Sequence, residues 1–473
     1  MRIHNCQPAP SYPHSDPLLG IDWTMTLMRK AQANETLQWF HGLYTEVGNT
    51  HWNNNLGTWN LTTNEPENVK AILATQFESW PIASLRLRFG LLALGPHAIF
   101  STNGHEWQEA RAMIRPSFVR NQIADFECIE KHMCNFLARL PSDGSKIDLQ
   151  DLLYDFTMDT STDFMFGYST NTLVKPSPEA LEFIESFTYS LFTAANRGRA
   201  GWVAFWLPNK KLNDAVWKCK RFIDHYMEEA LAEGKPKASY VFMNQMVESG
   251  ASHEYIRDQL LAMILGGRDT TASTLSALFW TLARRPDVVE KLRAEITKEL
   301  GDEAPTWETL KNMSYLNMVL KEALRLWPPV ASNFRCANKD VVLPKGGGPD
   351  GQSPVFVPKG SGCRWVTWSM HRRKDLYEED AEEFRPERWE TLRTSWEYVP
   401  FSGGPRICIG QQFAWTMMSY LVARVFQTFR AIEARDDREM AIKLGVTTSL
   451  PNGCWVSLAS VTTEATPCHV VQT

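Results

Sequence analysis

Clusters of basic residues that would bind nucleic acid are missing from this sequence. The formal net charge is −5, with 49 Lys and Arg and 54 Asp and Glu spread along 473 residues. Binding to a phosphate backbone requires concentrated positive charge. Nucleic acid is therefore excluded as an expected partner.

Paired cysteine motifs are also absent. The nine cysteines are scattered, and no two of them form a C-x-x-C arrangement. Disulfide frameworks and zinc sites are marked by regular cysteine spacing. We therefore expect reduced thiols in a cytosol-facing compartment.

The chain lacks membrane spans and domain linkers as well. There is no run of about 18 apolar residues and no secretory leader, and no Ser/Gly-rich linker divides the sequence. Prolines recur in Cys6–Pro17, and they favour an extended path. We predict an extended proline-rich segment over residues 1–20 and one domain over residues 21–473.

Helical periodicity dominates the remaining sequence, because apolar residues recur at i, i+3 and i+4 among strong helix formers. Strand-like pieces are short. The sequence thus predicts a mainly α fold with a small β region. The predicted helices are Pro178–Ala195, Leu212–Glu233, His253–Arg285, Val288–Leu300, Tyr315–Leu326 and Ile409–Ala434, and the predicted strands are Gly57–Thr62, Asp340–Leu343, Val355–Val357, Cys363–Thr367 and Cys454–Leu458.

One glycine-rich stretch, Gly346–Gly351, matches the dinucleotide-binding pattern G-x-G-x-x-G. That motif must open a helix whose N-terminus holds the pyrophosphate. Here the extended segment Pro354–Pro358 follows it. We predict a hairpin turn instead.

The most informative stretch is Phe401–Gly410, which reads F-S-G-G-P-R-I-C-I-G. Its glycines allow a tight turn and a close approach to a flat ligand. Cys408 stands where the predicted helix begins, and the free N–H groups of a helix start favour the thiolate over the thiol. Arg406 can hold an anionic edge of the ligand. A lone Cys-x-Gly would favour a buried structural cysteine; the complete pattern favours a metal-ligating thiolate.

A second pattern joins two distant segments. Glu322 and Arg325 lie one helical turn apart, and Arg388 follows in Phe384–Trp389. A carboxylate shared by two guanidinium groups fixes geometry, and we expect this structural cluster to hold the cysteine loop. E-x-x-R alone is a common surface pair; its position before Trp327-Pro-Pro distinguishes it here.

Together with Trp107-x-x-x-Arg111, these motifs make residues 6–458 resemble the cytochrome P450 family. The resemblance implies the P450 fold, with a long central helix over a haem and the cysteine loop beneath it. It implies haem b (iron protoporphyrin IX), with Cys408 as the ligand of the iron. The haem-binding residues that it implies are Trp107, Arg111, Arg335, Phe401, Arg406 and Gly410.

The predicted helix His253–Arg285 contains Gly266-Gly-Arg-Asp-Thr. Glycine inside a helix costs roughly 1 kcal/mol relative to Ala, which is understandable if a ligand approaches there or the helix opens locally. Asp269 and Thr270 would then relay protons to bound O2, and we predict them as catalytic. The alternative is a packing notch with Asp269 in a salt bridge. We expect Arg268 to pair with a neighbouring carboxylate.

The sequences of these motifs are similar to those of the fungal n-alkane and fatty-acid hydroxylase branch. Gly266 departs from that branch, which usually has Ala there, and this weakens the inference to a straight-chain substrate. We expect a hydrophobic small molecule, either fatty-acid- or alkane-like or a natural product. Each pocket candidate could equally belong to the core. They are Ile99, Phe100, Met263, Leu265, Gly266, Val330, Ser332, Asn333, Thr447, Thr448 and Ser449.

The resemblance implies a monooxygenase that receives NADPH-derived electrons from a separate reductase. Trp202–Leu207 forms an apolar patch that predicts contact with a membrane interface. The branch implies an anchoring helix before residue 1 and a place at the endoplasmic reticulum membrane, facing the cytosol. Candidate residues for docking the reductase are Arg115, Arg120, Arg373, Lys374 and Arg424, for each of which solvated surface charge is the simpler interpretation.

Two other functions stay open at this point. One is a haem–thiolate isomerase, dehydratase or peroxide-dependent enzyme of fungal secondary metabolism. The other is a non-catalytic binder of hydrophobic ligands. Turnover that depends on a reductase and O2 would distinguish a monooxygenase from an isomerase, dehydratase or peroxide-dependent enzyme. A reduced haem that does not react would support a non-catalytic binder.

Overall fold

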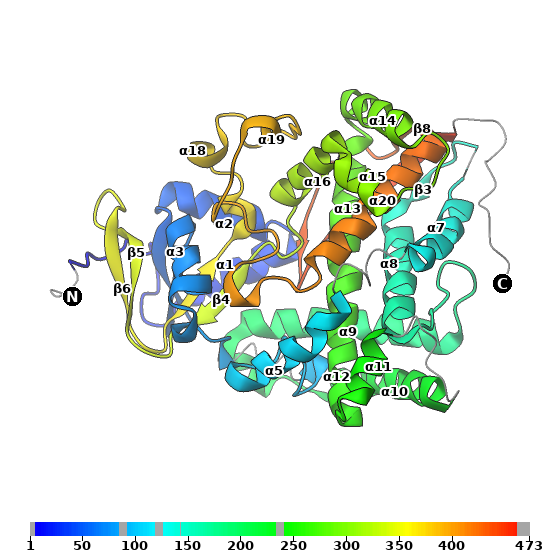
Figure 1. Cartoon of the computed structure of the whole chain (residues 1–473). Coiled ribbons are helices and arrows are strands. Elements are labelled where there is room, and N and C mark those ends of the chain that lie inside the picture. The colour runs from blue at the N-terminus through cyan, green and yellow to red at the C-terminus, as the bar shows by residue number, and fades with distance from the viewer. Residues whose placement is uncertain (1–4, 85–91, 119–125, 142, 233–240, 461–473) are drawn as a thin grey trace.

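The computed structural model describes residues 5–84, 92–118, 126–141, 143–232 and 241–460. Helices dominate these residues, which confirms the predicted mainly α fold with a small β region. Figure 1 shows one part rich in strands beside the chain's N-terminal helices, and a larger helical part next to it. Among the described residues, no helix is both long and apolar enough to cross a bilayer.

The helical core forms because apolar side chains recur on one face of each helix. In α16 (Ser314–Leu326), Leu316, Val319, Leu320 and Ala323 are all fully buried. This helix packs against α13 and α20, and α13 also packs against α8. The principal helices of this part are α5 (Gly104–Ile114), α7 (Glu127–Arg139), α8 (Leu149–Phe166), α9 (Pro178–Ala200), α10 (Lys210–Ala232), α11 (Val241–Glu248), α12 (His253–Ile264), α13 (Thr270–Leu282), α14 (Pro286–Leu300), α15 (Trp307–Asn312), α16 and α20 (Gln411–Thr428).

The largest sheet of the strand-rich part has the order β1-β2-β7-β4. Strands β2 and β7 run parallel, and the other two pairs are antiparallel. Helices α1 (Ile21–Gln32), α2 (Thr36–Glu46) and α3 (Pro66–Lys70) belong to this part (Figure 1). The strands are β1 (Thr50–Asn55), β2 (Thr58–Thr63), β4 (Asn333–Cys336) and β7 (Gly362–Trp365).

Three smaller sheets complete the β region. Strands β5 (Val341–Gly347) and β6 (Ser353–Val357) form a hairpin, which confirms the predicted turn at Gly346–Gly351. The N-terminal segment is attached here, because the N–H of Gly348 donates to the carbonyl of Pro8 at 3.1 Å. The other sheets pair β9 (Lys443–Leu444) with β10 (Thr448–Ser449), and β11 (Trp455–Ser460) with β3 (Ile147–Asp148) and β8 (Phe429–Ala434).

Several predicted bounds are wrong. The predicted helix Ile409–Ala434 merges α20 with β8, and the predicted helix His253–Arg285 is interrupted by a π-helical turn, Leu265–Asp269. Cys134 is disulfide-bonded, so the expectation of reduced thiols throughout fails at this residue. Seven other cysteines of the described residues are not disulfide-bonded.

Candidate active site

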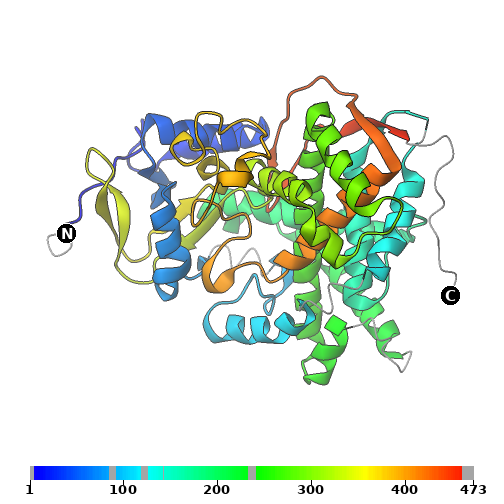
Figure 2. The same cartoon turned by 45° about the horizontal axis from the view of Figure 1, so that its top comes forward.

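The cysteine loop is a tight turn between the strand-rich part and the helical part (Figure 1, Figure 2). The backbone N–H of Cys408 donates to the carbonyl of Phe401 at 2.9 Å, which closes the turn. Ser402 and Gly404 both have a left-handed φ of 64°, and such a φ is costly for a residue that has a Cβ. Helix α20 begins at Gln411, three residues after the cysteine.

The loop glycines allow close contact within the protein. A Cβ on Gly404 would lie 1.9 Å from the carbonyl oxygen of Leu73, and a Cβ on Gly403 would lie 2.5 Å from the ring of Trp396. At Gly410 a Cβ would make ordinary contact with Phe118, at 3.5 Å. Glycines 403 and 404 thus bring the loop against its own scaffold, and the approach of their backbone to a ligand stays a prediction.

The environment of Cys408 combines loss of water with the thiolate-favouring N–H that was predicted at the helix start. Loss of water raises the pKa of its thiol, while a backbone hydrogen bond from Gly410 and the charge of Arg111 oppose this shift. The residue nevertheless keeps accessible surface. A side chain that is enclosed by protein yet accessible lines an internal space. This arrangement fits a buried ligand, and a bound metal cation would itself deprotonate the thiol.

Cationic and aromatic side chains gather beside the cysteine. The Arg406 guanidinium carbon lies 4.3 Å from the ring centroid of Trp107, and that of Arg111 lies 6.0 Å from the same centroid. Arg406 also donates to the carbonyl of Thr102 at 2.7 Å. Three of the predicted haem-binding residues, from α5 and the cysteine loop, therefore come together.

Arg335 lies on β4 and is buried. It donates to the Oδ1 of Asn333 and to the carbonyl of Phe334, both at 2.9 Å. Buried guanidinium groups such as Arg335 fit the acidic edge of a haem, since anions taken out of water need cationic partners. The chemistry of these donors therefore agrees with the implied cofactor.

The glycine pair of the central helix lies in the π-turn Leu265–Asp269, where the regular hydrogen-bond ladder is widened. The two glycines differ in their surroundings. A Cβ on Gly267 would lie 2.6 Å from the Oγ of Ser161 on α8, so Gly267 is a packing notch. A Cβ on Gly266 would meet nothing closer than the ring of Phe100, at 4.0 Å. Gly266 therefore leaves open space, as a ligand-facing position requires.

The predicted proton relay shows two separate hydrogen bonds. The Thr270 hydroxyl donates to the carbonyl of Gly266 at 2.7 Å, across the π-turn. Asp269 accepts from Arg268 at 2.7 Å, which confirms the expected pairing of that arginine. Burial raises the pKa of Asp269, and Arg268 opposes the shift. In this conformation Asp269 is held in the salt bridge that the alternative interpretation describes.

Glu322 lies at the centre of the expected charge cluster and is fully buried. Its carboxylate accepts five hydrogen bonds: two from Arg325 at 2.9 and 2.8 Å, one from Arg388 at 2.9 Å, one from the indole of Trp389 at 3.0 Å and one from the backbone N–H of Arg385 at 2.9 Å. Both guanidinium groups are buried as well. The sequence thus correctly placed these three residues in one cluster.

His371 connects this cluster to the cysteine loop and was missed in the sequence. Its Nδ1 lies 3.0 Å from the carbonyl of Arg325, and the backbone N–H of Val399 donates to its Nε2 at 3.0 Å. These two partners require a neutral ring with the proton on Nδ1. Burial lowers the pKa of His371 to about 3. Val399 lies two residues before Phe401, so the ring fixes the entry to the loop.

The predicted pocket residues cluster around the central helix. Met263 and Leu265 are buried, as is Ile99, whose N–H donates to the Oε1 of Gln259 at 3.0 Å. The hydroxyl of Thr448 lies 2.8 Å from that of Ser273 on α13. Helix α12, the π-turn, the strands β4 and β10 and the turns next to them thus supply the candidates, and their role in the pocket stays a prediction.

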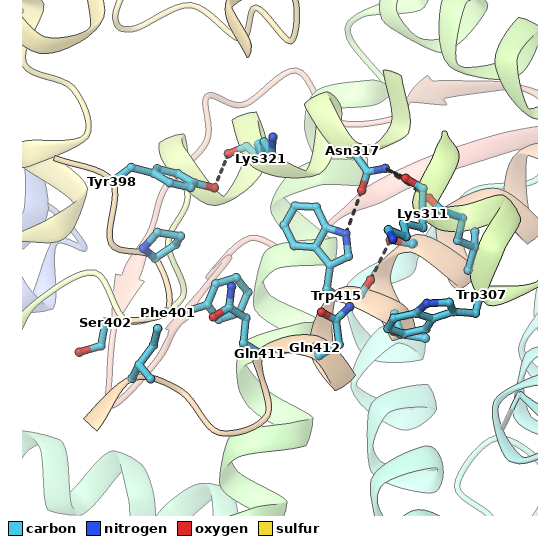
Figure 3. A pocket seen from close by; sticks show the side chains of 15 residues that line it. Trp307, Lys311, Asn317, Lys321, Tyr398, Phe401, Ser402, Gln411, Gln412 and Trp415 are labelled. Atoms are coloured by element: carbon cyan, nitrogen blue, oxygen red, sulfur yellow. Dashed lines mark hydrogen bonds between the residues drawn. The ribbon is translucent and has the colours of Figure 1, made fainter. Parts of the chain in front are cut away.

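A separate pocket of about 470 Å³ lies beside the cysteine loop (Figure 3). Residues of the loop and of α15, α16 and α20 line it, including Lys311, Lys321 and Trp415. It contains none of the predicted substrate residues. The indole N–H of Trp415 donates to Asn317 at 2.9 Å, which joins α20 to α16.

Three of the expected reductase-docking cations are paired with carboxylates. Arg373 contacts Asp375 at 2.6 Å, Lys374 contacts Glu379 at 2.9 Å and Arg424 contacts Glu130 at 2.8 Å. Arg115 is exposed, and Arg120 lies outside the described residues. The predicted cationic face is therefore largely neutralised at these positions.

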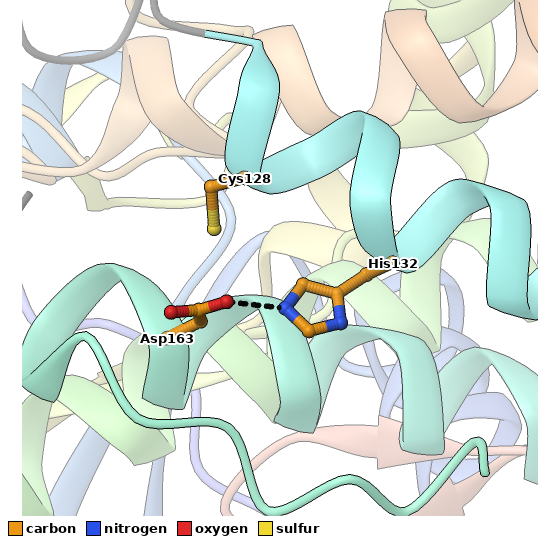
Figure 4. Close-up of side chains that lie close together, drawn as sticks. All are labelled: Cys128, His132 and Asp163. Carbon is orange, nitrogen blue, oxygen red and sulfur yellow. Dashed lines mark hydrogen bonds and ion pairs between the residues drawn. The ribbon is translucent and has the colours of Figure 1, made fainter. Parts of the chain in front are cut away.

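One cluster of metal-ligating side chains lies between α7 and α8 (Figure 4). The ligand atoms of Cys128, His132 and Asp163 all lie within 4.8 Å of one another. The Nε2 of His132 contacts Asp163 at 2.8 Å, and the ammonium group of Lys131 contacts the same carboxylate oxygen at 3.0 Å. This cation already compensates the carboxylate. The cluster therefore serves as a polar link between α7 and α8.

Comparisons with known proteins agree with this geometry. The family model for cytochrome P450 matches residues 13–453. The chain is 40% identical over 465 residues to cytochrome P450 monooxygenase himC of Aspergillus japonicus, covering 96% of this chain and 84% of that relative. It is 38% identical over 470 residues to cytochrome P450 monooxygenase FPY7 of Fusarium mangiferae, covering 96% and 90%. It is 41% identical over 401 residues to cytochrome P450 52A3-A of Candida maltosa, covering 79% and 76%.

Replacing the central carboxylate tests the charge cluster. Glu322→Gln leaves Arg325 and Arg388 buried without their counter-charge, and we expect a loss of roughly 3–5 kcal/mol in the free energy of unfolding. Urea unfolding followed by tryptophan fluorescence measures it. Glu182→Gln, which removes an exposed carboxylate paired with Lys218 and Arg221, is the matched control and should have a small effect. Equal losses in the two variants would contradict the assignment.

His371 predicts a specific pH dependence of stability. Its pKa is about 3 in the folded chain and 6.5 in an unfolded one, so only the unfolded chain takes up this proton between these values. Its contribution to stability is complete above pH 6.5 and falls by up to about 1.4 kcal/mol per pH unit as the pH decreases toward 3. His371→Asn should therefore lose less stability than the parent protein between pH 7 and pH 5 in urea unfolding. A pH dependence identical to the parent's would contradict the prediction, and exposed His105→Asn is the control.

Proposed function

The chain belongs to the cytochrome P450 monooxygenase family, and we propose that it is a haem–thiolate oxygenase that inserts one oxygen atom from O2 into a hydrophobic small molecule. Electrons would come from NADPH through a separate reductase. Cys408 carries this proposal, because its sulfur keeps accessible surface inside the protein beside Arg111, Trp107 and Arg406. A thiolate-ligated haem supplies the O2-activating chemistry by pushing electron density toward O–O cleavage.

The residues of the chain then have distinct tasks. Cys408 would supply the sulfur ligand, and Arg111, Arg335 and Arg406 would hold the acidic edge of the haem. The hydroxyl of Thr270 borders the open space at Gly266 and can orient a proton donor there. Asp269 would bring protons from the α8 side after release from Arg268, because burial raises the pKa of its carboxyl and makes it a better proton carrier than an exposed aspartate.

We propose a hydrophobic substrate from one of two classes. The predicted pocket is lined mainly by apolar side chains such as Ile99, Met263 and Leu265, which suits a fatty-acid- or alkane-like chain or a natural product. The relatives include monooxygenases of filamentous fungi and of Candida maltosa. Both substrate groups therefore remain within the proposal.

We also propose contact with the cytosolic face of the endoplasmic reticulum membrane. The turn Gly201–Trp206 has exposed tryptophans at 202 and 206, the second with 81% of its surface accessible. Exposed Leu18, Leu19 and Met25 lie in or next to α1, and the indole of Trp202 donates to the carbonyl of Leu56 in the β1–β2 turn. Tryptophan and leucine side chains favour the interfacial layer of a bilayer.

Reductase docking is proposed on the side of the cysteine loop where the pocket of Figure 3 opens. Lys311 and Lys321 line this pocket, and electrons that enter here have a short path through the loop to Cys408. Cations at an interface mainly accelerate association with an acidic partner.

Replacement of the sulfur ligand tests the haem–thiolate proposal. Reduced protein with carbon monoxide should show the long-wavelength Soret band of a thiolate-ligated haem, and Cys408→Ala should lose it completely. Cys336→Ala, which also removes a free thiol, is the control and should keep the band. A band that survives in Cys408→Ala would overturn the ligand assignment.

Removal of the Thr270 hydroxyl tests the proton relay. We expect Thr270→Ala to consume NADPH while product formed per NADPH falls by at least about tenfold, since general acid catalysis typically contributes about 10²–10⁴-fold to the rate. Thr274→Ala is a matched control, because its hydroxyl makes the same type of bond, to the carbonyl of Thr270, one turn further along. Coupling that is equal in both variants and the parent would refute the relay.

A further inference from the structure

Two arginines from distant segments meet at the edge of the predicted substrate pocket. Arg199, near the end of α9, donates to the carbonyl of Leu444 and to the Oδ1 of Asn196. Arg364, in the middle of β7, donates to the hydroxyl of Ser332 at 3.2 Å. Neutral groups alone accept these hydrogen bonds.

Aromatic rings surround the second arginine. The guanidinium carbon of Arg364 lies 5.4 Å from the ring centroid of Phe40 and 5.7 Å from that of Phe334. Such rings stabilise a cation and exclude water, but they do not neutralise its charge. Arg364 is thus held in a fixed place in low-dielectric surroundings.

Among the described residues, no carboxylate contributes to the pKa shift of Arg199 or of Arg364. Loss of water and, to a smaller extent, the charge of Arg364 together lower the pKa of Arg199 to about 10. Loss of water also lowers the pKa of Arg364, with Tyr44 and Cys363 as the opposing groups. By contrast, Arg257, also an enclosed arginine, contacts Asp224 at 3.3 Å and Glu254 at 3.0 Å. Two enclosed like charges without an anion are costly, so an anionic ligand would stabilise them.

The neighbours of this pair place it beside the reaction site. Ser332, which Arg364 contacts, is one of the predicted pocket residues. Leu444, which Arg199 contacts, pairs with Thr448 across β9 and β10, and Thr448 contacts Ser273, three residues after Thr270. Both arginines keep part of their surface accessible. A ligand can therefore contact them.

We propose that Arg199 and Arg364 form a binding site for the anionic end of the substrate, a carboxylate or an acidic enol, so that the hydrophobic remainder extends toward Gly266 and Thr270. The substrate class is thereby narrowed to hydrophobic acids. This inference rests on the proposed function for the identity of the reaction. The charge recognition itself rests only on the two arginines and their neighbours.

Matched probes test the site. Equilibrium dialysis of labelled dodecanoic acid and methyl dodecanoate against the haem-loaded protein at pH 8 compares an anion with its neutral ester. We expect the parent protein to bind the acid at least about tenfold more tightly, as expected for a bidentate charge-assisted contact. Arg199→Gln and Arg364→Gln should each lose most of this preference, with ester binding changed by less than about threefold.

A nearby arginine provides the control. Arg197→Gln removes a buried charge from the same helix, but Arg197 donates to Asn209 and to the carbonyl of Pro208. This variant should keep the acid preference. A long-chain 4-hydroxy-2-pyrone and its O-methyl ether form a second probe pair, and they distinguish an acidic enol from a carboxylate as the preferred anion.

Two outcomes would overturn the inference. One is equal binding of acid and ester, and of hydroxypyrone and ether, by the parent protein. The other is an acid preference that persists in both arginine variants. The carbon monoxide spectrum of the same samples distinguishes the two proposals. A normal thiolate band without a preference for the anion refutes only the arginine site. A preference for the anion without that band refutes only the haem–thiolate function.

Discussion

The buried carboxylate of Glu322 is the group on which the geometry of the site depends. An ionised group without water must have all its oxygen lone pairs occupied by donors, and five hydrogen bonds do this here. The donors come from α16 and from the segment that begins at Arg385, so the two segments cannot separate without exposing an uncompensated charge. Arg325 extends the constraint by donating to the carbonyls of His371 and Ala381 at 2.7 and 2.6 Å. His371 then holds Val399, and the cysteine loop follows.

This scaffold explains why the loop can contain strained residues. Ser402 adopts a left-handed φ, and Gly404 lies against the backbone of Leu73. Local strain of this kind persists only where surrounding contacts determine the conformation. The loop is fixed at its entry by His371, across its middle by the bond from Cys408 to Phe401 and at its exit by α20. The position of the sulfur is therefore set by elements that do not touch it.

Residues whose role depends on a short spacing could be predicted from the sequence. The pair Glu322 and Arg325, the tight turn before Cys408 and the opening at Gly266 all follow from local backbone geometry. The β strand at Phe429–Ala434 was missed because its apolar residues continue the helical pattern of α20, and only pairing with β11 makes it a strand. His371 was missed because its partners, Arg325 and Val399, are 46 and 28 residues away. Desolvation raises the pKa of the Cys408 thiol and depends on the segments that enclose the loop, so it could not be predicted from the motif; the opposing N–H of Gly410 is local and could be.

Buried charge in this protein occurs in two forms that imply different roles. The charge of Glu322 is matched by side chains of the chain itself, and this makes it a structural element that needs no ligand. The charges of Arg199 and Arg364 are held by carbonyl, hydroxyl and aromatic groups, which orient a cation without neutralising it. A fold stabilised by a neutralised cluster such as that of Glu322 can tolerate two arginines without a counter-charge. The free energy lost at Arg199 and Arg364 is recovered when an anion binds. The same difference explains why motifs reveal the structural cluster, whereas only the folded structure reveals the arginine pair.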